Sequence, residues 1–73
     1  MAMTELKADV TGSVWKIVAS SGQVLQPGDT VMILESMKME IPVIAEDGGT
    51  LAELRVAEGQ PVSEGQTLAL VQE

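Results

Sequence analysis

The stretch GQVLQPGDTVMIL, residues 22–34, recurs as GQPVSEGQTLALV at residues 59–71, an offset of 37 positions (59 − 22). Outward from it, Gly12 recurs as Gly49, and the apolar residues Val14, Ile17 and Ala19 recur as Leu51, Leu54 and Val56. Because a glycine often marks a special backbone position, a shared spacing of three glycines predicts two copies of one structural unit. Solenoid proteins need more repeats than two, so we interpret the copies as halves of a single domain, residues 1–73.

Each copy is typical of short strands separated by turns. The turn sequences are Gln26-Pro27-Gly28-Asp29 and Ser63-Glu64-Gly65-Gln66. The strands predicted from β-branched and apolar runs are 6–10, 11–19, 24–25, 30–35, 39–44, 50–57, 61–62 and 67–72. Helical periodicity is weak throughout. Eight short antiparallel strands in two half-repeats predict an all-β, flattened barrel or sandwich with pseudo-twofold symmetry.

The apolar spacing within the longest strands is irregular. Shared apolar positions fall at 14, 17 and 19 and again at 51, 54 and 56, whereas a flat strand keeps a period of two. A step of three predicts a β-bulge or sharp bend at equivalent places in both copies. Trp15, whose counterpart is Ala52, lies off this spacing. We favour a mostly buried tryptophan at the edge of the core, with an exposed aromatic at a contact surface as the alternative.

Composition restricts both stability and chemistry. The 73 residues include neither cysteine nor histidine, so an aliphatic core has to stabilise the domain without disulfides. The usual general base and thiol nucleophile are missing, and no glycine-rich phosphate loop is present. We therefore predict no catalytic residue, no metal site and no enzymatic activity.

The charge distribution restricts the partners. The formal net charge is −7, and the basic residues are few and scattered: Lys7, Lys16, Lys38 and Arg55. Nucleic-acid binding needs clustered lysine and arginine, so it is excluded. The sequence contains neither a membrane-span-length apolar run nor the pattern of a signal peptide. We expect a cytoplasmic protein that does not bind membranes and is a monomer in isolation.

One segment, Glu35-Ser36-Met37-Lys38-Met39-Glu40, lies between the two copies and has no repeat counterpart of its own kind. Strands on both sides predict a hairpin tip, but tight hairpin turns prefer Asn-Gly or Asp-Gly. At such a tip Lys38 would present its amine, with the two methionines as a soft apolar patch for a partner and the glutamates fixing its register. The alternative is an extended strand whose methionines pack into the core.

This hexapeptide resembles the attachment signature of biotinyl domains, commonly Glu-Ala-Met-Lys-Met, and the resemblance covers nearly the whole chain. The residues that stand where the family places turns are Gly12, Gly28, Pro42, Gly49, Gly59 and Gly65. The resemblance implies a hammerhead barrel-sandwich with biotin bound covalently to Lys38. It also implies a biotin protein ligase that recognises the flanking residues Glu35, Ser36, Met37, Met39 and Glu40. Biotin carboxylase and carboxyltransferase components would then use the tethered biotin.

Two departures from the family pattern leave alternatives open. Ser36 replaces the usual alanine, which bears on the selectivity of the ligase. The first half lacks the insertion that forms a thumb in some carrier proteins, so the chain looks like a stand-alone attachment protein, with an excised carboxylase domain as the alternative. Because lipoyl domains share the fold, lipoate is the alternative cofactor, alone or in a dual biotin/lipoyl protein. Lipoyl domains usually carry Asp-Lys-Ala at the tip, however, which differs from Met37-Lys38-Met39 on both sides of the lysine. An unmodified structural sandwich module is the alternative from another class.

Overall fold

The computed structural model describes residues 2–73, and within them it contains eight strands and no helix. The strands are β1 (Met3–Lys7), β2 (Gly12–Ile17), β3 (Val24–Leu25), β4 (Asp29–Ser36), β5 (Met39–Ala45), β6 (Gly49–Leu54), β7 (Pro61–Val62) and β8 (Thr67–Gln72). They form two antiparallel four-stranded sheets, ordered β1-β8-β6-β3 and β5-β4-β2-β7. The predicted all-β sandwich is confirmed.

The two copies exchange turns across the pseudo-twofold axis. Each strand of the first half corresponds to the strand four places later in the chain, so β1 corresponds to β5 and β2 to β6. This exchange converts one sheet order into the other. The backbone N–H of Gly22 donates to the carbonyl oxygen of Leu51 (2.7 Å), and that of Gly59 donates to Val14 (2.7 Å). Both glycines have positive φ, 89° and 86°, which explains why glycine recurs at this position. Neither half is complete without the turn of the other.

Bulges occur at the places that the apolar spacing predicted. The β2–β4 register shifts between Val14 and Lys16, and the β6–β8 register shifts at the equivalent position between Leu51 and Glu53. Each bulge adds one residue to its strand, so two successive residues face solvent, Trp15 and Lys16 in β2 and Ala52 and Glu53 in β6. The next apolar side chains, Ile17 and Leu54, then pack against the core again.

The core is aliphatic, apart from one methionine, and comes from both sheets. Its largest fully buried side chains are Met32, Leu34, Leu51, Leu68, Val14, Val31 and Val71. No polar or charged residue among positions 2–73 is buried. Removal of aliphatic surface from water is therefore the main source of stability for this small domain.

Two predictions are corrected by the structure. The first strand covers Met3–Lys7 and not 6–10, because its pairing with β8 runs from Met3 opposite Gln72 to Lys7 opposite Thr67. The chain then bends from Asp9 toward β2. Trp15 is 49% exposed, so the favoured reading of a mostly buried tryptophan is wrong. Trp15 is the extra residue of the β2 bulge and is turned away from the core.

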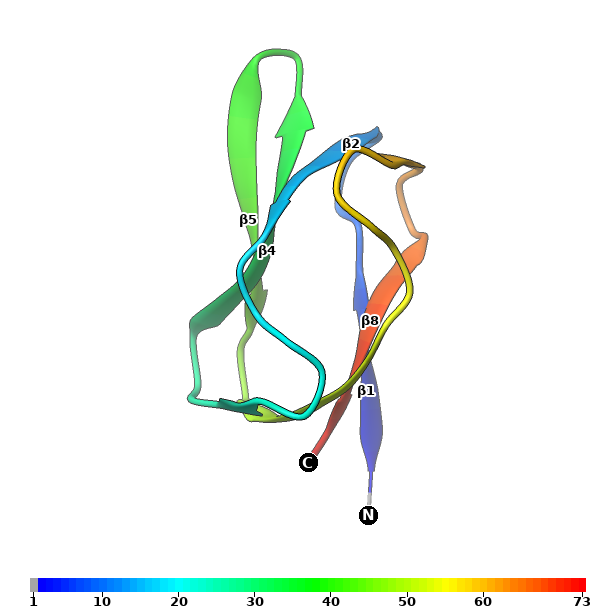
Figure 1. The fold of residues 1–73 in the computed structure, drawn as a ribbon. Helices are drawn as coiled ribbons and strands as arrows, with labels where there is room; N and C mark the ends of the chain where they lie inside the picture. Colours follow the sequence, from blue (N-terminus) through cyan, green and yellow to red (C-terminus); the bar gives the residue numbers. More distant parts are fainter. Residues whose placement is uncertain (1) are drawn as a thin grey trace.

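The molecule is elongated, with principal extents of 35 × 17 × 17 Å. The β4–β5 hairpin projects past the other strands at one end, and the chain termini lie at the opposite end (Figure 1). The Glu73 N–H donates to the Ala2 carbonyl oxygen (3.0 Å), which holds the two ends together. No helix in residues 2–73 has the length and apolarity needed to cross a bilayer.

Candidate functional site

The projecting hairpin ends in a two-residue turn made of Met37 and Lys38. Its flanking pair is Ser36 and Met39, which face each other in the β4–β5 register. Met37 and Lys38 have φ of 51° and 66°, both in the left-handed region that Asn-Gly normally occupies in such turns. A left-handed conformation costs an ordinary L-residue about 1–2 kcal/mol. The turn sequence is therefore not the one that would make this hairpin most stable.

The methionines that flank Lys38 are in water. Met37 is 93% exposed and Met39 64% exposed, and Lys38 between them is also exposed. The alternative in which these methionines pack into the core is therefore wrong. Exposed large apolar side chains on both sides of one lysine form a small patch at the end of the molecule, which is typical of a surface used by a partner.

Two glutamates stand at the base of the turn. Glu35 and Glu40 are directly opposite each other in the β4–β5 ladder, and both are exposed. Like charges at directly opposed positions destabilise a sheet. The hairpin thus combines three features that oppose its own folding: a strained turn, exposed methionines and an opposed pair of carboxylates. Features of this kind mark functional sites when the surrounding structure holds them in place.

The structure that holds the hairpin is the corner before β2. A Cβ atom on Gly12 would collide with the carbonyl oxygen of Glu35, so only glycine lets β2 approach β4 this closely. The Ser36 hydroxyl donates to the carbonyl oxygen of Thr11 (2.9 Å). The Thr11 hydroxyl oxygen in turn accepts from the backbone N–H of Glu64 (3.1 Å). These contacts fix the direction in which the tip projects.

All six residues singled out in the sequence, Glu35, Ser36, Met37, Lys38, Met39 and Glu40, therefore lie on this one hairpin. Sequence reasoning missed Thr11 and took Gly12, Pro42 and Gly49 for turn residues, although they lie in β2, β5 and β6. The repeat could not distinguish the two roles, because a glycine needed for close approach and one needed for positive φ look the same in a sequence. Within residues 2–73 no group of three or more potential ligands is arranged to hold a metal ion.

The chemistry available at this site is that of a primary amine. Lys38 has the reach and exposure to be acylated by a second protein, and the resulting amide would remain at the end farthest from the chain termini. No described residue near the tip is a histidine or cysteine that could act as a base or nucleophile beside it.

The comparisons with known proteins agree with this geometry. Residues 1–71 match the biotin/lipoyl family, described as "Biotin-requiring enzyme". A biotin/lipoyl attachment protein of Bacillus subtilis is 42% identical over 59 residues, which cover 81% of each chain. A biotin carboxyl carrier protein of Streptococcus mutans is 31% identical over 70 residues, or 96% of this chain and 54% of that one.

The fold comparison gives the same result. The Kluyveromyces lactis urea carboxylase crystal structure contains a segment that superposes on 99% of this chain with a TM-score of 0.92 and 32% identity. That segment is only 6% of the carboxylase chain, so the comparison concerns one small domain of a much larger protein. The chain belongs to the biotin/lipoyl attachment family.

Proposed function

We infer that this chain is a biotin carboxyl carrier and that Lys38 is the residue to which biotin is attached. The observation that carries the inference is the exposed primary amine of Lys38 at the tip of a strained hairpin, flanked on both sides by exposed methionines. The related proteins are carriers or carrier domains, and the chain lacks catalytic groups of its own. It is a non-catalytic component of a biotin-dependent carboxylase.

Attachment requires a separate ligase. The Lys38 amine nitrogen would attack the carbonyl carbon of biotinyl-adenylate, a carboxylic-phosphoric anhydride. The C–N bond of the amide forms as the C–O bond to the phosphate breaks, and AMP leaves with that electron pair. We assign the base that takes the amine proton to the ligase, because this chain has no histidine beside Lys38. Amide formation removes one positive charge from the hairpin and leaves the two glutamates.

Biotin held on Lys38 would supply carboxyl-group transfer between two active sites of partner subunits. The contribution of this chain is to hold that group on the end of a rigid hairpin, at the opposite end from both termini (Figure 1). Tethering raises the effective concentration of the group at each active site without new contacts. The bonds of Ser36 to Thr11 and of Thr11 to Glu64 keep the hairpin from swinging, so the motion comes from the lysine arm.

We propose that the ligase recognises the hairpin by apolar contact with Met37 and Met39, here called the methionine collar, and by electrostatic attraction to Glu35 and Glu40. Met37 and Met39 offer flexible thioether surface on both sides of the reacting amine. Glu35 and Glu40 bracket that surface and align it with cationic groups of the ligase. Ser36 belongs to the same recognition segment and also fixes the hairpin through its bond to Thr11.

Met37→Asn should separate stability from recognition. Asparagine tolerates the left-handed region better than methionine, so the free energy of unfolding should rise by about 1 kcal/mol in a urea titration. Loss of the thioether should slow biotin attachment by about tenfold, the effect of removing one important contact. Met3→Asn, at an exposed methionine far from the hairpin, should leave the attachment rate unchanged. A rate of biotin attachment to Met37→Asn equal to or higher than that of the parent protein would reject the role of Met37 in ligase recognition.

Carboxyl transfer is the test of the carrier function. The biotinylated chain is incubated with a biotin carboxylase subunit, Mg-ATP and radiolabelled bicarbonate, and label on the chain is measured after rapid gel filtration. Label should appear only on biotinylated protein and should be abolished by prior addition of avidin. Equal labelling of the unmodified chain, or none on the biotinylated chain with several carboxylases, would contradict the function.

A further inference from the structure

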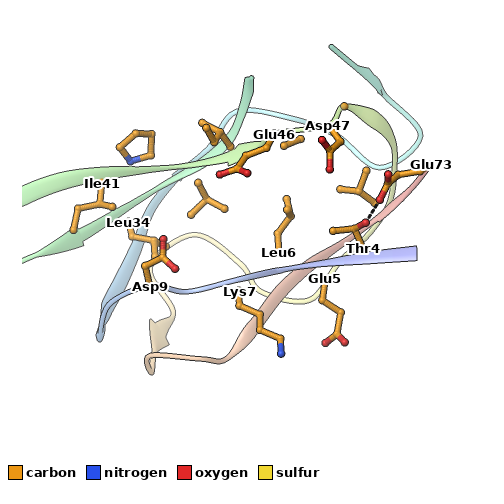
Figure 2. Close-up of a pocket in the computed structure, with 16 residues that line it drawn as sticks. Thr4, Glu5, Leu6, Lys7, Asp9, Leu34, Ile41, Glu46, Asp47 and Glu73 are labelled. Carbon is orange, nitrogen blue, oxygen red and sulfur yellow. Dashed lines mark hydrogen bonds between the residues drawn. The ribbon is translucent and has the colours of Figure 1, made fainter. Parts of the chain in front are cut away.

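A groove of about 280 Å³ lies on the side of the molecule between β1 and β5. Figure 2 shows Leu6 of β1 pointing into it and Ile41 of β5 on the opposite wall. Val43 also lines the groove, and the core residues Leu34 and Val71 form its floor. β1 and β5 are edge strands of different sheets and do not pair with each other, so the sandwich is open on this side.

The groove runs between two strand edges. β1 pairs only with β8 and β5 only with β4, and no other strand within residues 2–73 pairs with their remaining edges. An unpaired edge is a template on which an extended segment can add as a further strand. Main-chain hydrogen bonds then supply affinity, and pockets for alternate side chains supply specificity.

The two edges are not equally able to accept a strand. In a hairpin with a two-residue turn, the pair flanking the turn is hydrogen-bonded and the bonding then alternates along the ladder. Ser36 and Met39 flank the turn and are the first hydrogen-bonded pair. Pro42 lies three positions further along, opposite Ile33, and is therefore in a non-hydrogen-bonded pair. Its backbone nitrogen points away from β4, toward the free edge of β5. Proline has no N–H, which blunts the β5 edge. β1 contains no proline and keeps its donors.

The charge around the groove selects the partner. The carboxylates that line it are Glu5, Asp9, Glu46, Asp47 and Glu73, against one ammonium group, Lys7. Of these, Glu73 accepts from the Thr4 hydroxyl and Glu5 accepts from Thr67 (2.6 Å). Asp9 and Glu46 lie at opposite walls in Figure 2. A basic segment is attracted to such a rim, and an anionic one is repelled.

We propose that this groove docks an extended segment of a partner protein in which apolar and basic residues alternate, added as a strand along β1. In an added strand, successive side chains point to opposite faces. Apolar residues would cover Leu6, Ile41 and the exposed part of the core, while lysine or arginine residues would meet the acidic rim. That the partner is a component of the carboxylase rests on the proposed function.

The biotin arm of Lys38 is the competing occupant. Ile41 is three residues from Lys38, so the arm starts near one end of the groove. The uncharged ring of biotin gains nothing from the acidic rim, however, and carboxylated biotin carries a negative charge that the rim repels. The charges therefore favour the basic segment.

The test uses biotinylated, isotope-labelled protein titrated with an acetylated peptide of alternating lysine and valine, followed by amide NMR shifts. Shifts should concentrate in β1 and in the turn after β5. Glu46→Lys combined with Asp47→Lys should weaken peptide binding by roughly tenfold. Glu53→Lys combined with Glu64→Lys, an equal charge change outside the groove, should weaken it much less. Equal loss in both variants, or shifts spread over the whole surface, would overturn the proposal.

Two further measurements separate this proposal from the proposed function. The groove variant should be biotinylated as fully as the parent by intact mass but should show a raised KM as substrate of the carboxylase. Biotinylated and unmodified protein, compared without peptide, should have the same shifts along β1. A difference there would place the biotin arm in the groove and overturn the docking of a basic segment, while leaving the carrier function intact.

Discussion

Lys38→Arg is expected to abolish biotin attachment completely. Arginine keeps the positive charge and the length of the side chain, but its guanidinium is not the primary amine that forms the amide. The chain should then give no streptavidin signal on a denaturing blot after co-expression with biotin ligase. Lys16→Arg, at an exposed lysine on β2, should be modified like the parent.

The stability of Lys38→Arg should be unchanged within about 0.5 kcal/mol, as is usual for an exposed substitution. Lost modification would then reflect lost chemistry and not lost folding. A biotin adduct that persisted on Lys38→Arg would place the attachment on another primary amine, that of Lys7, Lys16 or the amino terminus, and would reject the assignment of the site.

Gly12→Ala is expected to destabilise the domain and to misplace the hairpin. Its new Cβ would meet the Glu35 carbonyl oxygen, so β4 has to move away from the corner that carries Thr11. Overpacking of this kind costs about 1–3 kcal/mol, a large part of the stability of a small domain. Because Ser36 bonds to Thr11 at the same place, the rate of biotin attachment should fall as well.

The repeat supplies a matched control for this prediction. Gly49 is the counterpart of Gly12, has a φ of 122°, and a Cβ there would lie 2.6 Å from the carbonyl oxygen of Gln72. Gly49→Ala should therefore be at least as destabilising in a urea titration. Since it disturbs β8 and not the β4–β5 hairpin, its attachment rate, measured where both variants are folded, should match the parent. Equal slowing in both variants would contradict the role of Gly12 as a support of the hairpin.

Much of the fold follows from the sequence because two physical signals agree. Glycines at matching positions of the two copies mark turns such as Gly22 and Gly59, and these turns have the positive φ that requires glycine. The step of three after Val14 and after Leu51 predicted the bulges in β2 and β6. The register shifts between Leu6 and Lys7 and between Thr30 and Met32 were not predicted. The hairpin tip was predictable because its turn residues break the rule for tight turns, and Met37 and Lys38 do adopt the left-handed conformation.

Other features depend on long-range pairing, which local patterns do not encode. The start of β1 is set by its partner β8, so the alternating apolar and charged residues 6–10 placed the strand too late. Trp15 is exposed because it lies in the β2 bulge; its place off the apolar spacing indicated this, but the general tendency of tryptophan to be buried was preferred. The bond from Ser36 to Thr11 joins residues that are distant in the sequence. The groove between β1 and β5 exists only once both sheets are assembled.

Attachment of biotin to Lys38 is tested by intact-mass and fragment analysis of the protein purified from its native cell, with residues 36–39 resolved in the fragment series. We expect a single adduct with the mass of a biotinyl group on Lys38. A lipoyl group on Lys38, or an unmodified Lys38 in protein that carries the adduct at another position, would contradict this assignment.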